Sequence, residues 1–445
     1  MKVTGRRRYR AVAAVAVCVS ALGATGCGSD ATDETLTFRL WDEQAADAYR
    51  ASFEQFTADT GIDVSVVVVP WADYWSQLRL DIAAGAVDDV FWTNAVNVAD
   101  YARAGELVAI GESADAASVA SWDPAVVEQY TVDGRLWGVP QLTDPGIGLF
   151  YNADLLAAAG LRPQDVAALT WDPAADDDPL RAAARQLTHD AEGRTPDAAG
   201  FDERDIQQYG YSASNDLNAI LLQFLGSNGA AWQDGDRFVF ADPAGVQAIE
   251  YVVDLIEDEH VAPPAVETNP PTGGDVAREL FLRGELALFQ TGAYNLASIA
   301  ESADFAWGIA RLPEGPAGAV SVTNGVVAAA SAHSDHPDAQ RALLEWIGSA
   351  EGNAFLGRDG SALPAVTDAQ HVYFDLWADR GVDVSPLMEV LQSGVVQPPQ
   401  GARYGAAEAA MRPLLNEVFL GQRDVADGLG EAERAGNAAM DQDGS

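Results

Sequence analysis

An alternation of strand-like and helix-like segments near the start of the chain constrains the fold more than any other feature. Polar and apolar residues alternate over 35–41, and a β-branched apolar run occupies 64–69. Apolar residues recur at helical spacing over 45–59 and 71–84, and a third strand pattern covers 89–92. This β-α-β-α-β order predicts the start of a parallel sheet.

The length of the chain predicts more than one core. At 445 residues, it exceeds the size at which a single hydrophobic core keeps growing. Apolar strand-like runs and helical stretches also alternate along the rest of the sequence. We therefore expect an α/β fold with two lobes.

The N-terminal residues have the layout of a bacterial lipoprotein signal. A basic start over 2–10 precedes an apolar run over 11–24, and Ala24-Thr25-Gly26-Cys27 follows. The run has about 14 residues, against the roughly 20 that span a bilayer, so it is typical of a signal peptide. We expect removal of 1–26, lipidation of Cys27 and a flexible tether over 27–34. Ordinary cleavage near Ala24 is the alternative, and the basic start leaves twin-arginine export open.

The composition excludes several classes of protein. The chain has 26 Lys and Arg against 67 Asp and Glu, for a formal net charge of −41, whereas nucleic-acid binding needs a clustered cationic face. Lys2 is the only lysine, which excludes P-loop ATPases, Schiff-base enzymes and Ser-x-x-Lys acylating enzymes. The two cysteines are Cys18, within the signal, and Cys27, so we expect no intrachain disulfide.

Two segments raise the question of a metal, and both have simpler interpretations. His333 and His336 stand just before Pro337, which suits a loop that leads into a helix. The run Asp176-Asp177-Asp178-Pro179 could form a calcium loop, but Asp-Pro pairs are common at turns and helix starts. We therefore expect no metal and no cofactor. The acidic stretch 190–205 is interpreted as an exposed excursion of the second lobe.

Aromatic and polar residues follow the strand-like segments, where ligands bind in parallel sheets. Trp41-Asp42-Glu43 follows the first strand, Trp92-Thr93-Asn94 ends the third, and Tyr74-Trp75 opens the helix between them. Sugar rings pack their C–H faces on aromatic planes, and their hydroxyls bind amides and carboxylates. Each ring taken singly also suits a core position. Their clustering at strand ends favours a carbohydrate site.

Five short segments, in order along the chain, form a recognisable set. They are Asp89-Val-Phe-Trp-Thr-Asn94; Gly134-Arg-Leu-Trp-Gly-Val-Pro140; Gly148-Leu-Phe-Tyr-Asn152; Phe281-Leu-Arg-Gly-Glu-Leu-Ala287 with Thr291-Gly-Ala-Tyr294; and His336-Pro337 with Ala350-Glu-Gly352. With this set the chain resembles the family 1 extracellular solute-binding proteins. These are the carbohydrate receptors of ATP-binding cassette (ABC) importers and include maltose-binding protein.

The resemblance implies a type II periplasmic-binding-protein fold, in which the chain crosses three times between two lobes and the ligand lies in the cleft. We expect the first crossing at 142–144, the second near 305–307 and the third near 350–351. The expected division gives lobe I as 35–143 plus 307–350, and lobe II as 144–306 plus 351–445.

The resemblance also implies which residues contact the ligand. The first lobe would contribute Trp41, Asp42, Glu43, Trp92, Asn94, Asn97, Asn324 and Gly325. The strand-end argument adds Tyr74 and Trp75 to this set. Asp144 would lie at the hinge, and the second lobe would contribute Asn215, Tyr294, Asn295, Arg403 and Tyr404. Tyr294 stands where many members carry tryptophan, which predicts a smaller stacked area.

The leading functional hypothesis is a non-enzymatic receptor on the outer face of the cell membrane. It would be a monomer held by lipid on Cys27, and it would deliver a mono- or oligosaccharide to a membrane permease driven by a separate ATPase. The alternatives are a secreted glycoside hydrolase, which needs two carboxylates about 5–10 Å apart, and a receptor for a polyamine or a peptide.

Overall fold

The computed structural model describes residues 35–110, 116–268, 276–396, 398–401 and 403–441. The expected signal peptide, the tether over 27–34 and the lipidation site Cys27 lie outside these ranges. Within them, no helix combines enough length with enough apolar character to cross a bilayer.

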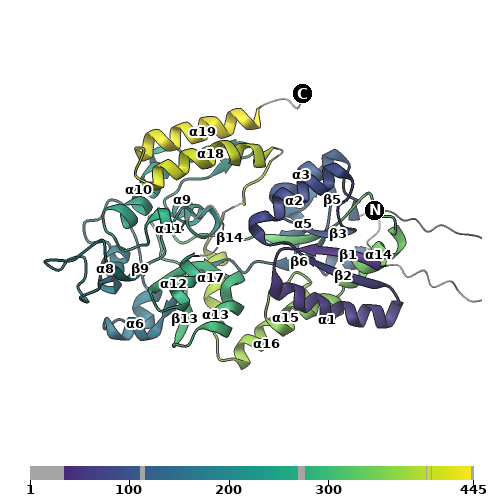
Figure 1. Cartoon of the computed structure of the whole chain (residues 1–445), viewed down its shortest axis with the longest axis horizontal. Coiled ribbons are helices and arrows are strands. Elements are labelled where there is room, and N and C mark those ends of the chain that lie inside the picture. Colours follow the sequence, from purple (N-terminus) through teal and green to yellow (C-terminus); the bar gives the residue numbers. More distant parts are fainter. Residues whose placement is uncertain (1–34, 111–115, 269–275, 397, 402, 442–445) are drawn as a thin grey trace, which may run out of the picture. The chain divides into compact units, whose positions relative to one another are not determined.

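The first sheet begins as the sequence predicts. Its parallel strands β1 (Thr35–Leu40), β2 (Asp63–Val68) and β3 (Val90–Thr93) lie in the order β3-β1-β2. Helices α1 (Glu43–Thr60) and α2 (Trp71–Ala84) connect them. The two connections step in opposite directions across the sheet. Right-handed crossovers therefore place α1 and α2 on opposite faces (Figure 1).

Three later strands extend the first sheet to the order β16-β6-β15-β3-β1-β2. They are β6 (Val139–Thr143), β15 (Gly325–Ala330) and β16 (Leu363–Pro364). Strand β15 is antiparallel to β3 and β6 and is buried along its whole length, as expected for a strand covered on both faces. This part of the chain also contains α3 (Ala95–Ala104), α4 (Ala116–Ala120), α5 (Pro124–Gln129), β4 (Thr131–Val132), β5 (Arg135–Leu136), α14 (Pro337–Ile347), α15 (Ala350–Asp359) and η4 (Thr367–Ala369).

The second sheet has the order β13-β7-β12-β9-β8. Its strands are β7 (Ile147–Asn152), β8 (His189–Asp190), β9 (Ile206–Tyr211), β12 (Leu286–Gly292) and β13 (Trp307–Ala310). The helices that accompany it are α6 (Ala153–Ala158), α7 (Pro163–Ala167), α8 (Pro179–Leu187), η2 (Leu217–Leu221), α9 (Leu222–Ser227), α10 (Pro243–Glu257), α11 (Ala265–Thr268), α12 (Val276–Leu282), η3 (Ala293–Asn295), α13 (Leu296–Ser302), α17 (Ser385–Ser393), α18 (Tyr404–Phe419) and α19 (Val425–Met440). Helix α16 (His371–Asp379) packs against α15. Short pairs are β10 (Gln233–Asp234) with β11 (Arg237–Phe238), and β14 (Ser321–Val322) with β17 (Val395–Val396).

The chain passes between the two sheets at three places. The first passage is at 144–146, between β6 and β7, beside the expected position. The prediction of a second crossing at 305–307 is wrong, because β13 still pairs with β7. The chain rejoins the first sheet only at β15, so the second passage lies at Thr323–Asn324.

The third passage also differs from its predicted position at 350–351. Helix α15 packs against α1, and β16 pairs with β6 in the first sheet. Val366 and Ala369 still belong to the core of that sheet, and α16 packs against α15. Tyr373 on α16 belongs to the cluster that contains Phe150 and Phe281. Helix α17 contacts β7 and β13, so the chain passes from the first sheet to the second over 367–384, and the expected lobe boundaries at 307 and 350 are corrected accordingly.

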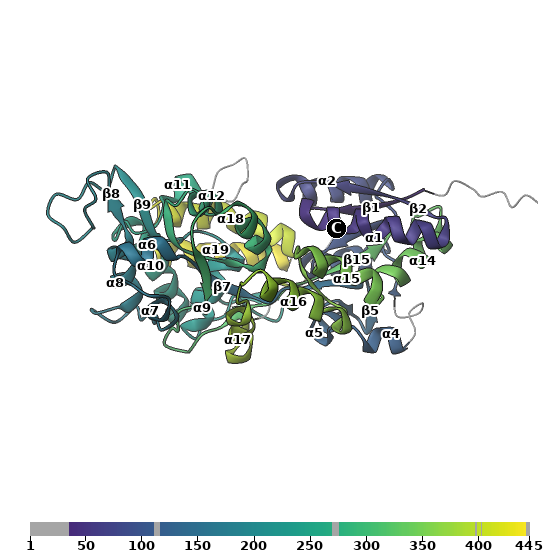
Figure 2. The same cartoon turned by 90° about the horizontal axis from the view of Figure 1, so that it is seen from below.

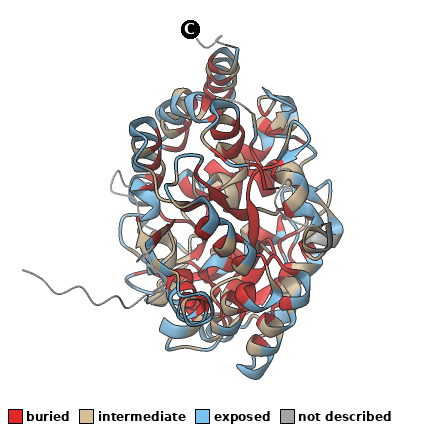
Figure 3. Ribbon diagram, turned by 90° about the vertical axis from the view of Figure 1, so that its right-hand side faces the viewer, coloured by how far each residue is buried: buried red, intermediate tan, exposed pale blue. Residues whose placement is uncertain are grey.

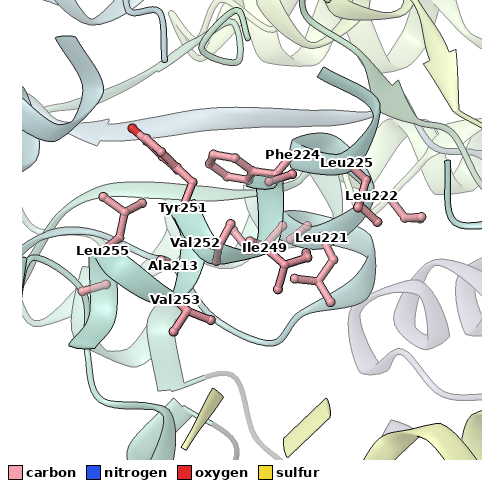
Figure 4. Packing of buried hydrophobic residues seen from close by; sticks show 14 of the residues in the cluster. Ala213, Leu221, Leu222, Phe224, Leu225, Ile249, Tyr251, Val252, Val253 and Leu255 are labelled. Carbon is pink, nitrogen blue, oxygen red and sulfur yellow. The ribbon is translucent and has the colours of Figure 1, made fainter. Parts of the chain in front are cut away.

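Each sheet has its own buried core. Figure 3 colours the buried residues red. Beside the second sheet, the rings of Phe224 on α9 and Tyr251 on α10 stack with centroids 5.8 Å apart. Figure 4 shows these rings beside Ile249 and Val252 of α10. The aromatic and aliphatic contacts fix α9 and α10 to each other.

The acidic segments around Asp178 and Asp190, beside the second sheet, have structural roles. Asp178 caps α8 by accepting the backbone N–H of Arg181 at 2.7 Å, and it also accepts the Tyr251 hydroxyl at 2.6 Å. The segment after β8 forms the excursion seen at one edge of Figure 2. It is tied to Asp190, which accepts backbone N–H groups of Arg194 and Asp202. Burial alone would raise the pKa of Asp190, but these bonds and the Arg194 guanidinium lower it to about 2.

Candidate functional site

Five aromatic rings gather at the carboxyl ends of the parallel strands of the first sheet. We call them the aromatic cluster, and its members are Trp41, Trp71, Tyr74, Trp75 and Trp92. The Trp41 ring lies at its centre, with centroid distances of 4.9 to 5.4 Å to the other four. Most of these contacts are edge-to-face, a favoured geometry for aromatic pairs. The cluster combines side chains from β3, from α2 and from the residue after β1.

Solvent exposure divides the cluster into a floor and an outer rim. Trp92 is 1% exposed and Tyr74 is fully buried, with its hydroxyl donating to the Trp92 carbonyl at 2.7 Å. The expectation that these two rings contact a ligand is therefore corrected, because neither presents a ring face outside the core. They support Trp41 and Trp75, which are partly buried.

Trp71 is the exposed member of the cluster, and the sequence analysis missed it. It is 53% exposed and contacts both Trp41 and Trp75 with centroids 5.3 Å apart. Trp71 follows β2 almost directly, since only Val69 and Pro70 separate them. The strand-end rule applied to Trp41 would also have selected Trp71.

The acidic residues after β1 have different surroundings. The Asp42 carboxylate caps α1 by accepting the Ala45 N–H at 2.8 Å. Burial raises the pKa of Asp42, against the lowering effects of its backbone hydrogen bonds and of Arg278. Glu43 is exposed, with one carboxylate oxygen 3.4 Å from the Arg50 guanidinium. Asp42 is therefore the better placed of the two for a fixed contact.

Two amides follow β3 and are bonded to each other. The Asn94 side-chain oxygen caps α3 and accepts both the backbone N–H of Asn97 at 3.3 Å and its side-chain amide at 2.8 Å. Further along α3, both Asp100 carboxylate oxygens lie 3.2 Å from the backbone nitrogen of Arg403. The helix thus connects the first sheet to the segment that precedes α18.

Arg403 and its neighbour Tyr404 are held by contacts within the protein. Arg403 has a left-handed backbone with φ of 71°, and its side chain donates to the Ala439 carbonyl at 3.0 Å. Tyr404 is 3% exposed, and its ring packs against Phe238. The expectation that Tyr404 contacts a ligand is corrected, because the ring lies in the core.

The first two passages between the sheets are tied together at Asp144. Its backbone N–H donates to the Asn324 carbonyl at 2.9 Å, and its carbonyl accepts the Thr323 hydroxyl at 2.9 Å. The carboxylate accepts the Gly146 N–H at 3.0 Å, but burial dominates and raises the pKa of Asp144 to about 7. Gly325, where β15 begins, is buried, and its carbonyl accepts the Tyr130 hydroxyl.

The predicted residues at the end of β12 separate into one exposed ring and one buried amide. Tyr294 is 46% exposed, whereas Asn295 is 2% exposed. The Asn295 amide donates to the Thr291 hydroxyl at 2.9 Å, and its oxygen lies 3.4 Å from an Arg278 guanidinium nitrogen. Arg278 also acts to lower the pKa of Asp42, so its charge acts on a residue of each predicted group. The sequence analysis gave no role to Arg278.

Asn215 forms a hydrogen bond to α18. Its side-chain amide donates to the side-chain oxygen of Asn416 on α18 at 2.9 Å.

Among the residues that the structure describes, no three His, Cys, Asp or Glu side chains gather as a metal site would require. The role of Asp178 as a helix cap agrees with the simpler interpretation of the Asp176–Pro179 run.

Comparison with known proteins identifies the family and the fold. Residues 41–354 match the family model described as bacterial extracellular solute-binding protein. The crystal structure of UspC from M. tuberculosis is 50% identical, covers 91% of this chain and 100% of its own, and superposes with a TM-score of 0.72.

Two curated relatives also match over most of their length. A probable ABC transporter-binding protein of Deinococcus radiodurans is 27% identical over 433 residues, which are 93% of this chain and 94% of the relative. The maltodextrin-binding protein MdxE of Bacillus subtilis is 25% identical over 366 residues, or 80% and 81% of the two chains. Proteins of this kind are receptors and not enzymes, which removes the glycoside hydrolase alternative. The chain belongs to the bacterial extracellular solute-binding protein family, with the mixed α/β fold of periplasmic binding proteins.

Proposed function

We propose that this protein is a receptor that binds a mono- or oligosaccharide and delivers it to an ABC permease. The observation that carries the proposal is the aromatic cluster, in which the buried Trp92 and Tyr74 support Trp41 while Trp71 remains 53% exposed. An aromatic face fixed at a strand end suits the C–H face of a sugar ring. The maltodextrin-binding relative supports a sugar over a polyamine or a peptide.

The proposed site contains aromatic surfaces and polar groups from both sheets. Trp41, Trp71 and Trp75 supply ring surfaces beside the first sheet, and Tyr294 supplies one at the end of β12. The polar residues selected from the sequence are the proposed partners of the sugar hydroxyls. They are Asp42, Glu43, Asn94, Asn97, Asp144, Asn215, Asn295, Asn324, Gly325 and Arg403, with Arg278 added.

Delivery requires that the permease distinguish the loaded receptor from the empty one. Two hydrogen bonds join the parts of the chain that are built on the two sheets. The Asp100 carboxylate accepts the backbone N–H of Arg403, and the Gln44 side-chain amide donates to the Glu301 carboxylate at 3.3 Å. A sugar held by residues of both sheets would favour the conformation in which they approach each other. The passages at 144–146, 323–324 and 367–384 are the proposed hinge.

We also propose that lipid on Cys27 anchors the receptor to the outer face of the cell membrane. A diacylglyceryl thioether with an N-acyl chain gives stable anchoring, whereas a single chain would bind only marginally. Fractionation of cells that express Cys27→Ala tests the anchor. We expect the variant in the soluble fraction, and equal membrane retention of variant and wild type would refute lipidation.

The sugar-binding proposal is tested by thermal shift and calorimetry with neutral sugars, polyamines and peptides. A ligand that binds only the folded state raises the melting temperature. We expect a neutral sugar to do so and to be recovered unchanged. A response to polyamines or peptides alone would assign a different solute.

A further inference from the structure

Gly292 and Tyr294 make an unusually close approach at the end of β12. A Cβ atom built on Gly292 would lie 2.2 Å from Cε1, 2.5 Å from Cδ1 and 3.0 Å from Cζ of the Tyr294 ring. Distances below about 3 Å do not occur for real Cβ atoms, so one edge of the ring occupies the space of a side chain at position 292. Gly292 itself is buried, whereas Tyr294 is 46% exposed.

The backbone of Gly292 gives no other reason for a glycine. Its φ of −84° and ψ of 169° are extended values that any residue adopts. By contrast, Gly61, Gly85 and Gly105 end helices with positive φ. At 292, the missing side chain leaves the space that one edge of the ring occupies.

The turn that carries the ring is held on both sides. The buried Asn295 amide donates to the Thr291 hydroxyl at 2.9 Å, across the residues between them. Ala293 is 8% exposed and packs in the core with Leu296. Since the backbone of 291–295 is fixed by these contacts, a Cβ at 292 would have to move the Tyr294 ring to another rotamer.

We propose that Gly292 is a positioning residue that sets the orientation of the Tyr294 ring toward the sugar. This inference rests on the proposed function, because it assigns Tyr294 to the ligand. Gly292 contacts no ligand in this account and acts through the ring alone. A side chain at 292 therefore lowers affinity only when the Tyr294 ring is present.

The test is a double-mutant cycle with Gly292→Ala, Tyr294→Ala and the double variant. Calorimetry with maltose and maltotriose as probes measures affinity, and circular dichroism confirms folding. We expect Gly292→Ala and Tyr294→Ala each to weaken binding by on the order of tenfold, and the double variant to match Tyr294→Ala. Gly430→Ala on α19 is the control, because its Cβ meets only the guanidinium of Arg434 at 3.3 Å.

A second readout needs no ligand. In protein labelled with 3-fluorotyrosine, the ¹⁹F resonance of residue 294 is assigned from its absence in Tyr294→Phe. We expect Gly292→Ala to shift this resonance and Gly430→Ala to leave it in place. If Gly292→Ala leaves the resonance unchanged, or weakens binding equally with and without the ring, the inference is overturned. If Tyr294→Ala does not weaken binding of either probe, or neither probe binds wild type, the assignment of Tyr294 to these sugars fails, while the resonance still tests the ring position.

Discussion

The indole N–H of Trp92 donates to the hydroxyl of Tyr49 at 3.1 Å. That hydroxyl donates in turn to the side-chain oxygen of Gln141 at 2.7 Å. The three residues lie on β3, α1 and β6, so one chain of buried hydrogen bonds joins two strands of the first sheet to a helix that covers it. Trp92 is thereby a structural residue at the base of the proposed sugar site.

Replacement of Trp92 is expected to affect stability before it affects binding. Trp92→Ala would leave a cavity beneath Trp41 and should lower the free energy of unfolding by about 3–5 kcal/mol, a typical loss for a buried aromatic residue. Urea denaturation followed by circular dichroism measures the change. Trp71→Ala, on the exposed rim of the same cluster, is the matched control and should lower it by less than about 1 kcal/mol. Equal losses for the two variants would show that the division into floor and rim is wrong.

Replacement of Trp71 should instead affect binding. Loss of its ring removes packing on the sugar worth about 1–3 kcal/mol, or roughly 5- to 150-fold in affinity. Calorimetry with a sugar that raises the melting temperature of wild type measures the loss. Leu80→Ala is the control, because Leu80 is an apolar residue of the same helix that is 70% exposed. An unchanged affinity for Trp71→Ala would remove this ring from the site.

The carboxyl group of Asp144 predicts a pH dependence of stability. Its pKa is raised from 3.8 to about 7 by burial, so the folded protein keeps this proton after the unfolded chain has lost it. The contribution of Asp144 is fully present below about pH 4, and it is lost as the pH rises from there to about 7. Asp144→Asn should remove that contribution. We expect the stability of the variant relative to wild type to be greater at pH 8 than at pH 5 in urea denaturation. A difference that is the same at both pH values would show that the pKa of Asp144 is not raised in the folded protein.

Sugar binding is expected to change the shape of the receptor in solution. If ligand contacts come from both sheets, binding favours the state in which the two parts approach. Small-angle scattering should then give a smaller radius of gyration with a sugar that raises the melting temperature. Stabilisation with an unchanged scattering curve would indicate a rigid site and would contradict signalling by closure.

The start of the fold could be predicted from sequence because its signals are local. Over residues 35–93, apolar residues recur at the spacings typical of strands and helices. Gly61 and Gly85 end the two helices with φ of 76° and 64°. The crossings were harder because strand pairing is not local. The short strand at Trp307–Ala310 gives no sign in its own sequence that it pairs with β7 in the second sheet.

The candidate site could be located but not resolved into ligand-facing and buried rings. Trp41, Trp71 and Trp92 all lie in or near strand ends, and a strand end identifies the region. Whether a ring remains exposed depends on distant partners, as Tyr49 and Gln141 show for Trp92. No local pattern around Trp92 reports those partners.

The most direct test of the central claim is calorimetric titration of the purified protein with neutral mono- and oligosaccharides, followed by chromatography of the recovered sugar. We predict saturable binding of one sugar per chain for at least one of them, and recovery of that sugar unchanged. Binding of polyamines or peptides with no response to any sugar, or conversion of the sugar during incubation, would contradict the account.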